Sequence, residues 1–87
     1  MEKREKKLLI LLLDQRKEIA MSVQEILTDF GCIVKTRLGI HDGVLDQCTN
    51  TGLIILELVE DQNKIKEMKE RLEKIQGVKT KLVELSL

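Results

Sequence analysis

Residues 8–13 read LLILLL, an unbroken apolar run that stops at Asp14. Helices usually need about 10–12 residues, so a short run with an abrupt end indicates a buried strand, over residues 7–13. A second run, LIIL at 53–56, indicates another strand over 52–59. A strand with one face in water alternates apolar and polar side chains, and neither run does. Both strands are therefore predicted to be apolar on both faces.

Two stretches with helical spacing accompany these strands. Apolar residues three and four positions apart predict one helix over residues 15–30 and a second over 62–76. Asp14 and Asp61 precede them, where a carboxylate can accept hydrogen bonds from the free N–H groups of the first turn. The two apolar stripes consist of Ile19, Val23, Ile26, Leu27 and Phe30, and of Ile65, Met68, Leu72 and Ile75.

A glycine follows each stripe, and a strand is predicted after each glycine. Gly31 and Gly77 stand where the left-handed backbone of a helix end favours glycine. Residues 32–40 are β-branched and roughly alternating, which predicts a strand, and residues 78–85 are predicted to form the last one. Cys32, at the start of its strand, is interpreted as a small buried hydrophobe.

The order strand–helix–strand, repeated twice, predicts an α+β fold of the ferredoxin-like βαββαβ type, as a single domain over residues 1–87. Its four-stranded antiparallel sheet would have the order 4-1-3-2, with both helices on one face. The helix-free face would then carry the second apolar faces of the two central strands. Because monomers rarely expose so large an apolar patch, we expect a homo-oligomer, a dimer or tetramer, formed through that face or an edge extending it.

Composition excludes several classes of function. With 15 basic and 15 acidic residues the net charge is zero, which argues against a nucleic-acid binder held by phosphate contacts. One Phe, with no Trp or Tyr, leaves no platform for base stacking. The longest apolar run is far below the roughly 20 residues of a membrane span. Two cysteines are too few for a disulfide scaffold, so we expect a cytoplasmic protein with reduced thiols and no membrane partner.

The polar segment between the second and third predicted strands, residues 41–51, is long for a hairpin loop. It contains His41, Asp42, Asp46 and Cys48, a set of ligand types that suits Zn, Ni, Co or Fe if a neighbouring subunit completes the shell. The alternative is a solvated loop whose His and Cys are incidental, since no CxxC or HxxxH spacing occurs. No group orients Cys48 and His41 as nucleophile and base, so no enzymatic activity is expected.

The strings KTRLGIH at residues 35–41 and GLIILEL at 52–58, set in the βαββαβ frame, add a resemblance. The chain resembles the small ACT-like iron-only hydrogenase system regulators, which are similar in fold to the C-terminal domain of the nickel-responsive repressor. The resemblance implies an oligomeric regulatory or sensory module without its own DNA-binding domain. It also implies an effector site at Arg37, Gly39 and Gly52.

Two departures from the related patterns bear on the ligand. ACT domains that bind amino acids generally use a glycine in the loop after strand one, and here no glycine occurs before Gly31. The nickel repressor domain uses several His and one Cys, of which only His41 and Cys48 have counterparts in this chain. Three functions stay open: a module that binds a small effector or acts through protein contacts, a transition-metal sensor or carrier using His41 and Cys48, and a structural interaction domain.

Overall fold

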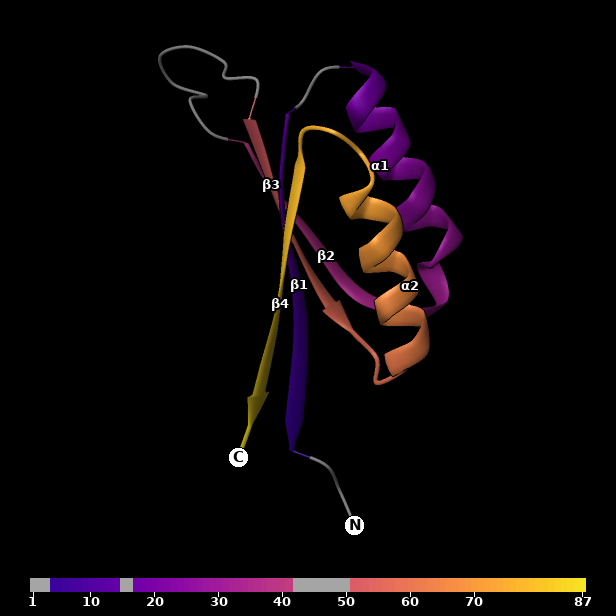
Figure 1. The fold of residues 1–87 in the computed structure, drawn as a ribbon. Helices are drawn as coiled ribbons and strands as arrows, with labels where there is room; N and C mark the ends of the chain where they lie inside the picture. The colour runs from indigo at the N-terminus through magenta and orange to yellow at the C-terminus, as the bar shows by residue number, and fades with distance from the viewer. Residues whose placement is uncertain (1–3, 15–16, 42–50) are drawn as a thin grey trace.

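The computed structural model describes residues 4–14, 17–41 and 51–87. Within these ranges the chain forms one layer of strands with both helices packed on one side (Figure 1). A 3-10 turn, η1 (Gly31–Ile33), follows the first helix. The elements in order are β1 (Glu5–Asp14), α1 (Lys17–Asp29), β2 (Val34–His41), β3 (Thr51–Leu58), α2 (Gln62–Glu73) and β4 (Val78–Ser86). No helix in the described ranges is long and apolar enough to span a membrane.

The strands form one antiparallel sheet with the order β2-β3-β1-β4. This confirms the predicted ferredoxin-like βαββαβ fold and its 4-1-3-2 sheet. In the register, Leu9 lies opposite Leu56 on β3 and opposite Leu82 on β4. Successive side chains of a strand point to opposite faces, so the odd-numbered residues of β1 face the helices. Accordingly, the buried leucines of β1 are Leu9, Leu11 and Leu13.

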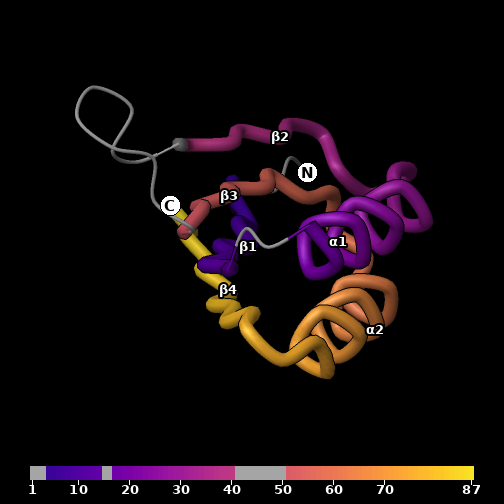
Figure 2. The backbone as a smooth tube through the Cα atoms, turned by 90° about the horizontal axis from the view of Figure 1, so that it is seen from above, coloured from indigo at the N-terminus to yellow at the C-terminus, as the bar shows by residue number. Residues whose placement is uncertain are grey.

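The core lies between the sheet and the two helices, which run side by side in the view from above (Figure 2). Both predicted helical stripes supply it: most of their residues are buried, and Ile19 and Ile75 are partly buried against the rest. The helices are also joined at the surface, where Arg71 Nη2 donates to Asp29 Oδ2 at 3.0 Å and the guanidinium lies 5.4 Å from the centre of the Phe30 ring. The buried residues from the helices are Val23, Ile26, Leu27, Ile65, Met68 and Leu72.

The beginning of β2 differs from the prediction. The strand expected from residue 32 begins at Val34, because residues 31–33 form a 3-10 turn in which the Ile33 N–H donates to the Phe30 carbonyl at 3.0 Å. This turn directs Ile33 into the core and leaves Cys32 exposed. The interpretation of Cys32 as a buried hydrophobe was therefore wrong, since Ile33 occupies the core position.

The ends of the helices confirm the predictions in part. Asp61 caps α2, and its Oδ1 accepts from the backbone N–H three residues later at 3.1 Å. Of the glycines that the structure describes, Gly77 alone has a positive φ, 93°, so the left-handed conformation predicted at Gly31 is wrong. There the chain continues directly into the 3-10 turn. The predicted capping by Asp14 involves residues 15–16, which lie outside the described ranges.

Candidate functional site

The helix-free face of the sheet carries a continuous apolar surface. Ile10 lies opposite Ile55 on β3, and Ile55 in turn lies opposite Leu38 on β2. One step along, Leu12 lies opposite Leu53, which lies opposite Ile40. Three of these side chains are still largely accessible: Leu12 is 47% exposed, Leu38 53% and Ile40 38%. We call the whole set the apolar sheet face: Leu8, Ile10, Leu12, Leu38, Ile40, Leu53, Ile55 and Val83.

Charged residues border this face at two places. On β4, Lys79 and Lys81 lie opposite Leu12 and Ile10, so one edge of the face is cationic. At the far end, Lys6 Nζ forms an ion pair with Glu57 Oε2 at 3.1 Å. The hydrogen bond and the positive charge of Lys6 lower the pKa of Glu57, assisted by nearby Lys35 and by the Thr36 hydroxyl. The apolar centre is therefore framed by cations on its β4 side and by a closed ion pair at its end.

The predicted effector residues lie on the other face of the sheet, near its β2 edge. Arg37 and Gly39 pair with Leu56 and Ile54, so both positions face the helix side. Gly52 is buried at the start of β3, opposite the last residue of β2. A Cβ at Gly39 would meet no atom within 4 Å, which leaves open space above this part of the strand. The structure thus places the three predicted residues on one side of two neighbouring strands.

Contacts at this edge hold the arginine against the first helix. A guanidinium N–H of Arg37 donates to Gln24 Oε1 on α1. His41 is the last residue of β2, and its backbone lies opposite Gly52. Cys48 and the rest of the predicted metal loop lie outside the described residues. Residues 4–14, 17–41 and 51–87 contain no group of three or more His, Cys, Asp or Glu that could hold a metal.

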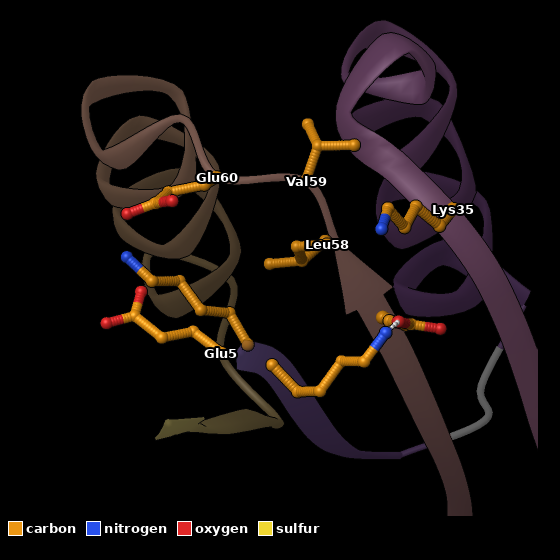
Figure 3. Close-up of a pocket in the computed structure, with 8 residues that line it drawn as sticks. Glu5, Lys35, Leu58, Val59 and Glu60 are labelled. Atoms are coloured by element: carbon orange, nitrogen blue, oxygen red, sulfur yellow. Dashed lines mark hydrogen bonds and ion pairs between the residues drawn. The ribbon is translucent and has the colours of Figure 1, made fainter. Parts of the chain in front are cut away.

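At the opposite end of the sheet, a cavity of about 210 Å³ opens where β1 begins and β3 ends. Leu58 and Val59 form its apolar wall, between Glu60 and Lys35 (Figure 3). The other lining residues are charged, and they include both lysines and glutamates. The full lining is Glu5, Lys6, Lys7, Lys35, Glu57, Leu58, Val59 and Glu60.

Lys7 is the unusual member of this lining, because it is only 6% exposed and is the buried charged residue of the described chain. Its position on β1 faces the helices, between Leu58 on β3 and Glu84 on β4. In the described ranges the Lys7 side chain forms no ion pair or hydrogen bond. Every fully buried polar side-chain atom in those ranges has a hydrogen-bond partner, so the Lys7 ammonium is not fully buried. The ammonium must therefore reach a cavity surface, since only its stem can be fully enclosed.

Lys7 also lines a second cavity of about 330 Å³, between β4 and α2. The apolar part of that cavity comes from Ile65 and Leu82, and further cations come from Lys66 and Lys69. Lys7 was not among the predicted site residues, because lysine side chains are usually exposed. A signal was nevertheless present: Lys7 has the same odd-numbered alternation as the buried leucines of its strand.

Comparison with known proteins defines the class of fold. No protein-family model matches the chain, and no curated protein matches it in sequence. A solved structure of an uncharacterized protein from Thermotoga maritima is 29% identical, with a TM-score of 0.81 over 98% of this chain and 100% of that one. The likeness extends over the whole domain but carries no assigned activity.

Two further structures share this fold at low sequence identity. The ACT domain from the GTP pyrophosphokinase of Chlorobium tepidum has a TM-score of 0.64 at 14% identity, covering 97% of this chain and 100% of that one. A nitrogen regulatory PII-like protein from Thiomonas intermedia K12, bound to ADP, AMP and bicarbonate, has a TM-score of 0.66 at 13% identity, covering 99% and 93%. The chain thus has the four-stranded, two-helix ferredoxin-like fold that ACT and PII-like domains share.

Proposed function

We propose that this protein is a small regulatory module that assembles as a homo-oligomer through the apolar sheet face and binds a small effector. The observation that carries the proposal is the accessible apolar face, where Leu12, Leu38 and Ile40 remain 38–53% exposed. A surface of this kind marks a site of association in proteins that work in water. The resemblance to iron-only hydrogenase system regulators supports the regulatory role and suggests the system in which it acts.

The size of the face suits a second copy of the chain. Strands of 8–10 residues rise by about 3.4 Å per residue, and four strands stand about 4.8 Å apart. The face therefore projects over roughly 500–600 Å², and side-chain relief increases its accessible area. A stable interface buries about 800 Å² per partner, so one sheet stacked on another approaches the required size.

The charges favour a contact centred away from β4. A two-fold contact places identical patches against each other. If β4 crossed β4, Lys79 and Lys81 of the two copies would approach one another, and like charges repel at close range. A contact centred on β1, β3 and β2 buries the apolar residues and leaves these lysines in the polar rim typical of interfaces.

The effector site in this proposal is the edge formed by Arg37, Gly39 and Gly52. A guanidinium can hold a carboxylate or phosphate through two parallel hydrogen bonds. The open space beside Gly39 leaves room for a ligand at that group. The PII-like relative binds ADP and AMP, so adenine nucleotides are the first ligands to test.

Two measurements test the proposal separately. Sedimentation at micromolar concentration should give a mass that is a multiple of the 10.0 kDa protomer, and a protomer mass would contradict the assembly. A thermal-shift screen against ADP, AMP and amino acids should find a ligand that raises the melting temperature, because ligands that bind the native state stabilise it. Arg37→Ala should abolish that shift, whereas Lys64→Ala, an exposed change on α2, should retain it.

A further inference from the structure

We propose a second ligand site, independent of the Arg37 edge, in which Lys7 binds the carboxylate or phosphate group of a small organic anion between β1 and α2. The apolar part of the ligand would lie against Ile65 and Leu82 in the 330 Å³ cavity. That volume is at the lower end of small-molecule pockets, which span about 300–1,000 Å³. The site thus fits a short-chain acid or a small phosphate ester.

The state of Lys7 is the primary reason for this assignment. An ammonium at the mouth of a largely enclosed side chain contacts little water, so an opposite charge within reach stabilises it. Lys7 is 94% enclosed, with 6% of its surface exposed, and makes no side-chain hydrogen bond or ion pair in the part of the chain described. An anion in the cavity would bring an opposite charge and acceptor oxygens to the ammonium at the cavity surface.

The remaining charges of the cavity favour an anion over a cation. Lys66 and Lys69 stand with Lys7 around it, against one acid, Glu84. Lys69 also forms an ion pair with Glu73 at 2.6 Å, so Lys66 is the second cation available to the ligand. The first residue of α2 lines the cavity as well, and the N-terminal end of a helix favours negative charge.

Glu84 offers the main competing explanation for Lys7. The two residues lie directly opposite each other on β1 and β4, on the same face of the sheet. Glu5 and Glu60 line the first cavity together with Lys7, so their carboxylates are further acids that could compensate its charge. If Lys7 is simply a structural partner of Glu84, then removing either charge should destabilise the fold and no anion should bind.

Binding of hexanoate and of inorganic phosphate to the purified full chain tests the assignment, with hexylamine and hexanol as matched ligands of other charge. We expect hexanoate to bind and raise the melting temperature, while hexylamine and hexanol do not. Lys7→Met should weaken binding at least about tenfold, and Glu84→Gln should tighten it several-fold, because a unit charge about 4 Å away changes affinity on this scale. Lys64→Met, on the same helix but outside the cavity, should bind as the wild type does.

The outcomes separate the two explanations. If hexanoate alone binds, the ligand is a carboxylate with an apolar part; if phosphate also binds, both anion types are accepted, and both results support the site. Absence of binding by both anions overturns it, as does equal binding by the wild type and Lys7→Met. If Glu84→Gln lowers the melting temperature and does not tighten binding, Lys7 is a structural partner of Glu84. Because sedimentation measures assembly independently, failure here leaves the proposed oligomer untouched.

Discussion

Replacing Leu12 with lysine tests assembly without disturbing the fold. Leu12 lies on the apolar sheet face opposite Leu53, and it is 47% exposed in the protomer. A lysine can lay its methylene stem along the same surface and keep its ammonium in water. The isolated protomer should therefore lose no more than about 0.5 kcal/mol, as is usual for surface substitutions. The full effect should appear only when a second copy covers the position.

The expected magnitude follows from the exposure of Leu12. Burying a leucine completely is worth about 1.5–3 kcal/mol, so the 47% still exposed represents about 1 kcal/mol. In a two-fold contact Leu12 occurs once in each copy, so the substitution removes this burial energy twice, roughly 2 kcal/mol. Leaving one buried charge without a partner costs a further 3 kcal/mol or more. A total of about 5 kcal/mol weakens the dissociation constant by 10³-fold or more.

Sedimentation velocity at micromolar concentration measures this change directly. Leu12→Lys should sediment as the protomer and keep the far-ultraviolet circular dichroism of the wild type. Met21→Lys is the matched control, because Met21 is 61% exposed on α1, on the other side of the molecule. It should remain assembled. If Leu12→Lys keeps the wild-type mass, or Met21→Lys dissociates to the same extent, the apolar sheet face is not the interface.

Three other changes have defined outcomes. Gly77→Ala should lower stability by roughly 1–2 kcal/mol in urea denaturation, because φ is 93° and the new Cβ would lie 3.0 Å from Ile19 Cδ1, whereas Gly39→Ala should be neutral. Hydrogen bonds from Lys69 and the Thr80 hydroxyl lower the pKa of Glu73 below its ordinary value of 4.5. The stability that ionised Glu73 contributes should therefore be lost as the pH falls below 4.5, and the melting temperature of Glu73→Gln should change less with pH in that range than that of the wild type. If the loop at residues 41–51 holds a metal, chelator-treated wild-type protein should bind Ni²⁺ or Zn²⁺ more tightly than His41→Ala or Cys48→Ala, because deprotonated His and Cys side chains are the ligands; equally weak binding by the wild type and both variants would show that this loop is not a metal site.

The sheet could be predicted because the apolar residues of its central strands fix both their place in the sheet and the face that they bury. The run at residues 8–13 is apolar on both faces, so it suits a central strand, and burial then selects the odd-numbered residues for the core. The helix stripes were equally clear from their spacing. Between Phe30 and Ile33, by contrast, two large apolar side chains compete for the core within one turn, and a 3-10 turn allows both to be buried. The secondary-structure propensities of these residues do not show whether a strand or a 3-10 turn follows Phe30.

The candidate sites were less predictable, because they depend on which residues the fold brings together. Arg37 and Gly39 could be singled out in the sequence, but the β2–β3 register decides on which side of the sheet they lie, and the Gln24 contact holds Arg37 against α1. Lys7 could not be singled out by residue type. Its burial depends on Glu84 and α2, which come far later in the chain, and on Leu58 at the end of β3.

β1 joins the two proposed surfaces, since its alternate residues belong to opposite faces of the sheet. Lys6 pairs with Glu57 at the end of the apolar sheet face, while the next residue, Lys7, faces the helix side and lines the cavity beside α2. A regulatory module needs its ligand and its assembly to influence each other, and that influence is reciprocal in free energy. If hexanoate strengthens assembly by some factor, the oligomer must bind hexanoate more tightly than the Leu12→Lys protomer does, by the same factor. If the oligomer and the Leu12→Lys protomer bind hexanoate with equal affinity, the Lys7 site has no influence on assembly, however tightly it binds the ligand.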